Sequence, residues 1–193
     1  MTNIENGKKA TTELLEHVRG GKKGLTTNLE KYNKQIDEGY LGHKQGNEMF
    51  TEEKDNFISS TRKMAQNLAK TLVEYEQQDI ERVKSTQDPV TADDVAELQL
   101  LSQIDTTSEE LSRYAEKYSN NQLALRRIDK IAKEKEIMLS LPESEEDKVR
   151  NSYNKLKRVA QRYEFYQVPT TGDVMGVADD MTIDAELAEL KQV

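Results

Sequence analysis

The chain has 193 residues, of which 35% are apolar and 33% are charged, and its formal net charge is −8. Globular domains usually contain more apolar and fewer charged residues, so one large continuous core is not expected. The chain contains no cysteine, which rules out disulfides, thiolate nucleophiles and cysteine metal sites. The composition predicts a protein that buries narrow apolar stripes, as helical bundles and coiled coils do.

Nothing in the sequence predicts contact with a membrane or secretion. The first residues, MTNIENGKKATTELLEHV, contain no apolar stretch of the kind found in signal peptides. No segment approaches the 18 or so consecutive apolar residues that a membrane-spanning helix needs. We therefore expect a soluble, cytoplasmic protein.

The distribution of glycine predicts the fold class. Seven of the nine glycines lie between Gly7 and Gly46, and residues 47–171 contain none. Glycine and proline are the main breakers of helices, so such a stretch favours helices joined by short connections. Because no run of β-branched and aromatic residues shows the period of two that strands require, we predict an all-α protein.

In chain order, the first region spans residues 1–50. It is predicted to be flexible and glycine-rich, with short helices at 11–19 and 26–38 separated by Gly20-Gly21-Lys22-Lys23-Gly24. A long helix is then predicted from Thr51 to about Lys84, about 50 Å in length at 1.5 Å per residue. Asp88-Pro89 is expected to end it.

A helical bundle is predicted to follow, so that residues 51–167 form a rod and bundle. Thr91 with Asp94, and Thr107 with Glu110, have the spacing of capping boxes. Val90 and Val95 have the spacing of a hydrophobic staple at the helix that Thr91 begins. Asn120-Asn121 is predicted to cap a further helix. The last long helix has two competing caps, Ser140 with Glu143 or Ser144 with Asp147. Because the predicted helices are short and are joined by short connections, they are expected to pack as an antiparallel bundle.

The C-terminal part is predicted to be a linker at 168–181 and a short amphipathic helix at 182–193. Ile183, Leu187 and Leu190 form a one-sided apolar stripe on that helix. A helix of two to three turns is marginal alone in water, so it is expected to dock on its own bundle or on another subunit. These three residues are candidate partner-binding residues.

Charge is distributed unevenly along the chain. Residues 88–119 carry a net charge of −6 and residues 169–193 one of −5, whereas residues 148–162 hold six cations and no acid. The basic segment supplies the further candidate partner-binding residues Arg150, Lys157, Arg158 and Arg162, and its interleaved tyrosines make nucleic-acid contact possible. Acids at 143–147 followed by bases also match the helix dipole, which favours a structural role.

No motif in the sequence predicts enzymatic chemistry. The two histidines, His17 and His43, lie in no metal-binding or catalytic spacing, and the glycine-rich segment at 20–24 lacks the spacing of a phosphate loop. We predict a protein that is not an enzyme, with no catalytic residues, no metal and no cofactor.

The acidic, cysteine-free chain resembles the scaffolding and minor structural proteins of tailed bacteriophages. The resemblance rests on the glycine-free middle at 47–171, the linker at 168–181 and the terminal helix with Ile183, Leu187 and Leu190. It implies that the rod oligomerises, that the terminal helix contacts the coat, and that the protein is found in the host cytoplasm or the virion. The terminal helix departs from the pattern because it is acidic, whereas the coat-binding ends of scaffolds are often basic.

These observations lead to two hypotheses. The first is a non-enzymatic helical structural or assembly protein that self-associates and contacts a protein partner, as in phage capsid or virion assembly. The alternative is a small acidic binding or inhibitor protein whose surface around 88–116 occupies the basic groove of a nucleic-acid-handling protein. Direct nucleic-acid binding through the basic segment is possible but not favoured.

Overall fold

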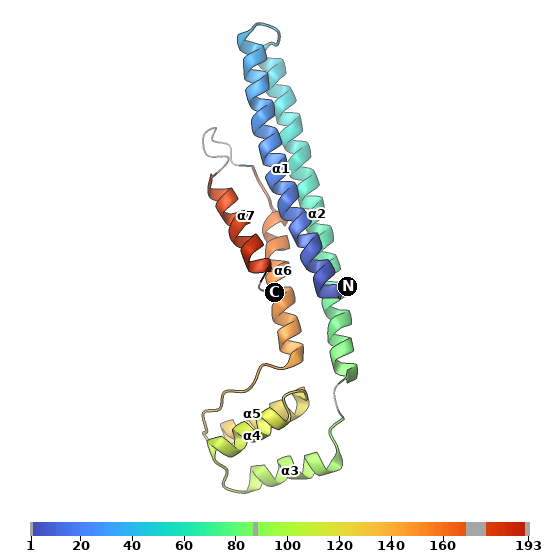
Figure 1. The fold of residues 1–193 in the computed structure, drawn as a ribbon, viewed down its shortest axis with the longest axis vertical. Helices are drawn as coiled ribbons and strands as arrows, with labels where there is room; N and C mark the ends of the chain where they lie inside the picture. Colours follow the sequence, from blue (N-terminus) through green and yellow to red (C-terminus); the bar gives the residue numbers. More distant parts are fainter. Residues whose placement is uncertain (1, 87–88, 169–176, 192–193) are drawn as a thin grey trace. The chain divides into compact units, whose positions relative to one another are not determined.

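The chain folds as α-helices joined by turns and short connections, which confirms the predicted all-α class (Figure 1). The computed structural model describes residues 2–86, 89–168 and 177–191, with the backbone alone for 177–180. Within this described part the elements are α1 (Asn3–Asp37), α2 (His43–Thr86), α3 (Ala92–Gln103), α4 (Ser108–Lys117), α5 (Gln122–Glu134), α6 (Glu145–Glu164) and α7 (Val177–Leu190).

The helices are grouped into two compact units. Unit 1 comprises residues 1–76 and 152–193, and unit 2 comprises residues 77–151. Unit 1 therefore contains α1, most of α2, the greater part of α6 and α7. Unit 2 contains α3, α4 and α5 together with the last residues of α2 and the first of α6.

Helix α1 corrects the prediction of two short helices around a glycine-rich joint. It runs without a break from Asn3 to Asp37 and passes through Gly20, Gly21 and Gly24. A side chain at Gly21 would overlap the ring of Phe57 on α2, whereas a Cβ at Gly20 or Gly24 would meet nothing within 4 Å. Glycine costs roughly 1 kcal/mol per position in a helix. Burial of the apolar face of α1 offsets that cost. The buried residues of this face include Leu14, Leu15, Val18 and Leu25.

Helices α1 and α2 form an antiparallel hairpin within unit 1 (Figure 1). The turn between them uses Gly39, whose φ of +77° is in the region that glycine adopts most readily. Helix α2 begins at His43 rather than at the predicted Thr51. The two helices are joined near Glu53, which accepts hydrogen bonds from Tyr32 Oη at 2.5 Å and Asn28 Nδ2 at 2.9 Å.

The core of unit 1 lies where α6 joins this hairpin. The absence of a side chain at Gly7 leaves room for Leu72 of α2 and Leu156 of α6. Phe57 packs edge-on against Tyr166, with ring centroids 5.8 Å apart. The buried residues that α2 and α6 contribute include Ala65, Leu68, Leu72, Tyr153, Leu156, Val159, Ala160 and Tyr163.

Unit 2 confirms the predicted capping boxes and the predicted cap of α5. Thr91 and Thr107 form capping boxes with Asp94 and Glu110, and Asn121 caps α5. Of the two competing caps, Ser144 is the one used, since its Oγ accepts from the N–H of Asp147 at 3.1 Å. The core of unit 2 consists of Leu98, Leu101, Leu111, Ala115, Tyr118, Ala124, Leu125, Ile128, Ile131 and Ala132.

Helix α3 and its C-cap carry aliphatic residues at steps of three, from Val95 to Ile104, and bury only some of them. Leu98 and Leu101 are in the core, whereas Val95 and Ile104 are 53% and 44% exposed. Leu100, which lies beside the stripe, is 56% exposed. Helix α3 therefore presents aliphatic side chains to solvent on more than one side.

At the C-terminal end, α7 begins at Val177, earlier than the helix predicted at 182–193. The predicted linker at 168–181 therefore overlaps the first residues of α7, and its middle, residues 169–176, lies outside the described residues. Helix α7 packs against α1 within unit 1.

Candidate interaction surfaces

The cations of α6 proposed from sequence as partner-binding residues are mostly engaged within the chain. Lys157 Nζ donates to Glu76 Oε2 at 2.8 Å, and both side chains are largely buried. Arg150 pairs with Glu146 at 2.7 Å in unit 2. Arg162 forms an ion pair with Glu186 of α7. Among the described residues, Arg158 forms no ion pair.

The predicted apolar stripe of the C-terminal helix lies largely against unit 1 of its own chain. Ile183 and Leu190 are buried, and Leu187 is half-buried. Polar contacts add to this packing: Arg19 of α1 pairs with Asp184, and Tyr163 Oη donates to a Glu186 carboxylate oxygen at 3.1 Å. The described side chains of α7 thus serve mainly to hold it on α1 and α6.

A groove of about 460 Å³ lies between α6 and α7. Lys155, Arg158 and Arg162 line one wall, and Glu186 and Glu189 line the other. Burial raises the pKa of Glu186, and the neighbouring Arg162 opposes that effect. A strong nucleic-acid site needs cations that neutralise several phosphates in a row. Here Glu186 and Glu189 face the three cations of the groove, and Arg162 already pairs with Glu186.

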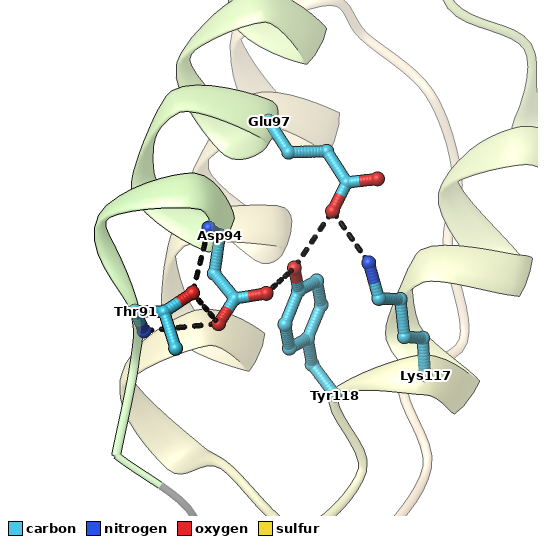
Figure 2. Close-up of polar contacts among 5 residues, drawn as sticks. All are labelled: Thr91, Asp94, Glu97, Lys117 and Tyr118. Carbon is cyan, nitrogen blue, oxygen red and sulfur yellow. Dashed lines mark hydrogen bonds and ion pairs between the residues drawn. The ribbon is translucent and has the colours of Figure 1, made fainter.

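In unit 2, the phenol of Tyr118 connects α3 to the end of α4 (Figure 2). Tyr118 Oη lies 2.7 Å from Asp94 Oδ1 and 2.9 Å from Glu97 Oε2, and Lys117 Nζ donates to the same Glu97 oxygen at 2.5 Å. Asp94 also accepts from the backbone N–H and the hydroxyl of Thr91, at 2.9 and 2.7 Å. We call these five residues the Tyr118 cluster.

The electrostatics of the Tyr118 cluster keep each group in its ordinary charge state near neutral pH. Hydrogen bonds from Tyr118 and Thr91 lower the pKa of Asp94 to about 2. The hydrogen bond from Lys117 lowers the pKa of Glu97, and in turn raises the pKa of Lys117. Burial, followed by the hydrogen bond to Asp94, raises the pKa of the Tyr118 phenol. The cluster therefore suits holding α3 against α4 better than it suits proton transfer, which needs a pKa near the working pH.

An apolar groove of about 400 Å³ lies between α3 and α5 in unit 2. Its lining residues are Val90, Val95, Leu98, Gln99, Leu123, Ala124 and Arg127. Leu123 is 71% exposed and Val95 is 53% exposed, so two aliphatic side chains at this groove face water. Residues of the predicted staple, Val90 and Val95, both belong to the groove lining. We call this surface the α3–α5 groove.

The α3–α5 groove is not among the candidate sites predicted from the sequence. A signal was present in Leu123, which precedes the buried pair Ala124-Leu125 and lies outside the apolar stripe of α5. Leu100 of α3 lies next to the buried Leu101 and gives the same signal for a different surface, because it does not line the groove. Adjacent apolar residues in a helix point to different sides, so one of them is left for another surface.

In the part of the chain that the structure describes, no group of three or more His, Asp or Glu side chains is placed to hold a metal ion. None of the described helices combines the length and the apolar character needed to cross a membrane.

Comparisons of the sequence with protein-family models and with curated proteins, and of the fold with solved structures, find no match. The class that the fold itself defines is an all-helical protein with two compact units.

Proposed function

We propose that the chain is a non-enzymatic helical assembly protein that self-associates and contacts a protein partner. The observation that carries the proposal is the α3–α5 groove, where Leu123 and Val95 are more than half exposed. Scattered apolar side chains are normal on protein surfaces, but a groove lined by several of them is typical of a protein-binding site. Its lining is suited to packing against the apolar face of a helix.

The use of charge within the chain supports the same proposal. Three of the four proposed cations of α6 pair with carboxylates of their own unit, and the Tyr118 cluster occupies Asp94 and Glu97. These contacts favour a structural role for much of the charge. The apolar groove is then the better candidate for external contact.

The setting that we propose is capsid or virion assembly in a tailed bacteriophage, with the protein in the host cytoplasm or the virion. The support for this setting is the resemblance of the acidic, glycine-free helical middle to scaffolding proteins. The alternative of an acidic inhibitor has less support. Its proposed surface contains Asp94 and Glu97, and both carboxylates already accept hydrogen bonds from Tyr118.

Self-association is tested by sedimentation velocity and light scattering over a range of protein concentrations, at about 0.1 M and 1 M salt. We expect the average mass to rise with concentration at both salt levels, because apolar contacts persist when charges are screened. Salt is expected to shift the protein concentration at which half of the chains are associated, but association should occur at both salt levels. A monomer at every concentration and both salt levels would contradict the proposal.

A further inference from the structure

The α3–α5 groove has a basic rim on the α5 side. Arg127 lines the groove, and Arg126 is the exposed residue beside it. Among the described residues, neither guanidinium forms an ion pair. An occupant that places an apolar side chain on Leu123 and a carboxylate beside these arginines would satisfy both features.

A second exposed surface lies on the opposite side of α3. At about 100° per residue, Leu100 lies about 140° around the helix from Val95 and therefore faces away from the groove. Asp93 falls on the same side as Leu100, since it is seven residues before it, and Ile104 is the C-cap residue four positions after Leu100. Leu100 and Ile104 are 56% and 44% exposed, and Asp93 is exposed. We call these three residues the outer face of α3.

We propose that the outer face of α3 in one copy of the chain occupies the α3–α5 groove of a second copy. This inference rests on the proposed self-association and names its surfaces. Leu100 would pack on Leu123 and cover an exposed aliphatic side chain on each copy. Asp93 would lie toward Arg126 and Arg127, so the charge on the outer face is opposite to the charge on the rim.

The contact is heterologous, because each copy offers one surface and receives the other. Two different surfaces on one chain leave one of each free after the first contact, so the assembly continues until a ring closes or a filament forms. A pairing of two identical grooves would stop at a dimer and would place Arg126 and Arg127 of both copies near each other. The basic rim therefore favours the heterologous arrangement.

Two single substitutions each disrupt one of the two proposed surfaces and leave the other intact. Leu123→Lys removes an aliphatic group from the groove and adds a charge like that of its rim, and Leu100→Lys puts a cation on the face that meets the rim. Because both side chains are more than half exposed, the helices should form in both variants, which circular dichroism checks. The matched control is Met138→Lys, since Met138 is 97% exposed and belongs to neither surface.

The test is sedimentation velocity on each variant alone and on an equimolar mixture of Leu123→Lys with Leu100→Lys. Each variant alone should associate at least about tenfold more weakly than the wild type, while Met138→Lys associates like the wild type. The mixture should form a discrete dimer, because one partner keeps its groove and the other keeps its outer face. If either variant alone associates as strongly as the wild type, or if the mixture stays monomeric, the inference is overturned but the proposed self-association still stands. A wild-type chain that is monomeric throughout would overturn both.

Discussion

At the scale of single residues, Tyr118 shows how unit 2 fixes the position of α3. Its hydroxyl lies between Asp94 and Glu97, and Lys117 reaches the second of these carboxylates (Figure 2). Asp94 also closes the capping box with Thr91. One carboxylate thus both starts α3 and attaches it to the end of α4, so changes at this position affect local and tertiary structure together.

The lowered pKa of Asp94 predicts an acid-dependent loss of stability. Its pKa falls from 3.8 to about 2 on folding, so the ionised carboxylate stabilises the folded state above about pH 4. That contribution is lost as the pH falls through the folded-state value. We expect Asp94→Asn to be less stable than the wild type at pH 6, with the difference shrinking steadily between pH 4 and pH 2. Urea unfolding followed by circular dichroism measures this difference in the free energy of unfolding at each pH.

The control for this prediction is Glu116→Gln, which removes an exposed carboxylate of α4 that belongs to neither proposed association surface. Its stability relative to the wild type should change little over the same pH range. The role of Asp94 would be contradicted if the stability difference between Asp94→Asn and the wild type were as large at pH 2 as at pH 6.

The capping residues could be predicted from sequence, and the Tyr118 cluster could not. A capping box joins residues three apart, so Thr91 with Asp94 and Thr107 with Glu110 are visible in the sequence. Tyr118 is 24 residues from Asp94 and 21 from Glu97. Such a contact depends on how α3 and α4 pack, which local patterns do not specify.

At the scale of elements, α1 shows why composition misled the prediction for the N-terminal region. Glycines normally predict breaks, but tertiary packing can override intrinsic propensity. Gly21 gives the Phe57 ring its space, and that ring also contacts His17 and Tyr166, with centroids 5.5 and 5.8 Å away. The reason for this glycine thus lies on α2, far away in the sequence.

Three of the four glycines of α1, Gly20, Gly21 and Gly24, should respond differently to alanine. Gly21→Ala should lower the free energy of unfolding by about 1–3 kcal/mol, because the new Cβ would overlap the ring of Phe57. Gly20→Ala and Gly24→Ala should raise it by about 0.5–1 kcal/mol each, since nothing lies within 4 Å of either new Cβ and alanine favours the helix. Urea unfolding of the three variants checks both signs. Equal effects at Gly20 and Gly21 would contradict the close packing of Gly21 against Phe57.

At the scale of the whole molecule, the two units differ in how their charged and apolar groups are used. In unit 1, the acidic α7 neutralises cations of α1 and α6 through Asp184 and Glu186. In unit 2, aliphatic side chains remain exposed in the α3–α5 groove and on the outer face of α3. The composition predicted narrow apolar stripes, and the glycine-free stretch at 47–171 predicted an all-α fold. It could not predict which stripe would be left uncovered, because that depends on which helices pack together.

The absence of cysteine allows the central claim to be tested by site-specific cross-linking. Leu100→Cys and Leu123→Cys each introduce a single thiol, one on each proposed surface, and the two variants are mixed with a short bismaleimide cross-linker. We predict a cross-linked dimer that contains one copy of each variant, with little cross-linking of either variant alone. Cross-linking of Leu123→Cys to itself as efficient as in the mixture, or no dimer in the mixture, would contradict the contact between the outer face of α3 and the α3–α5 groove.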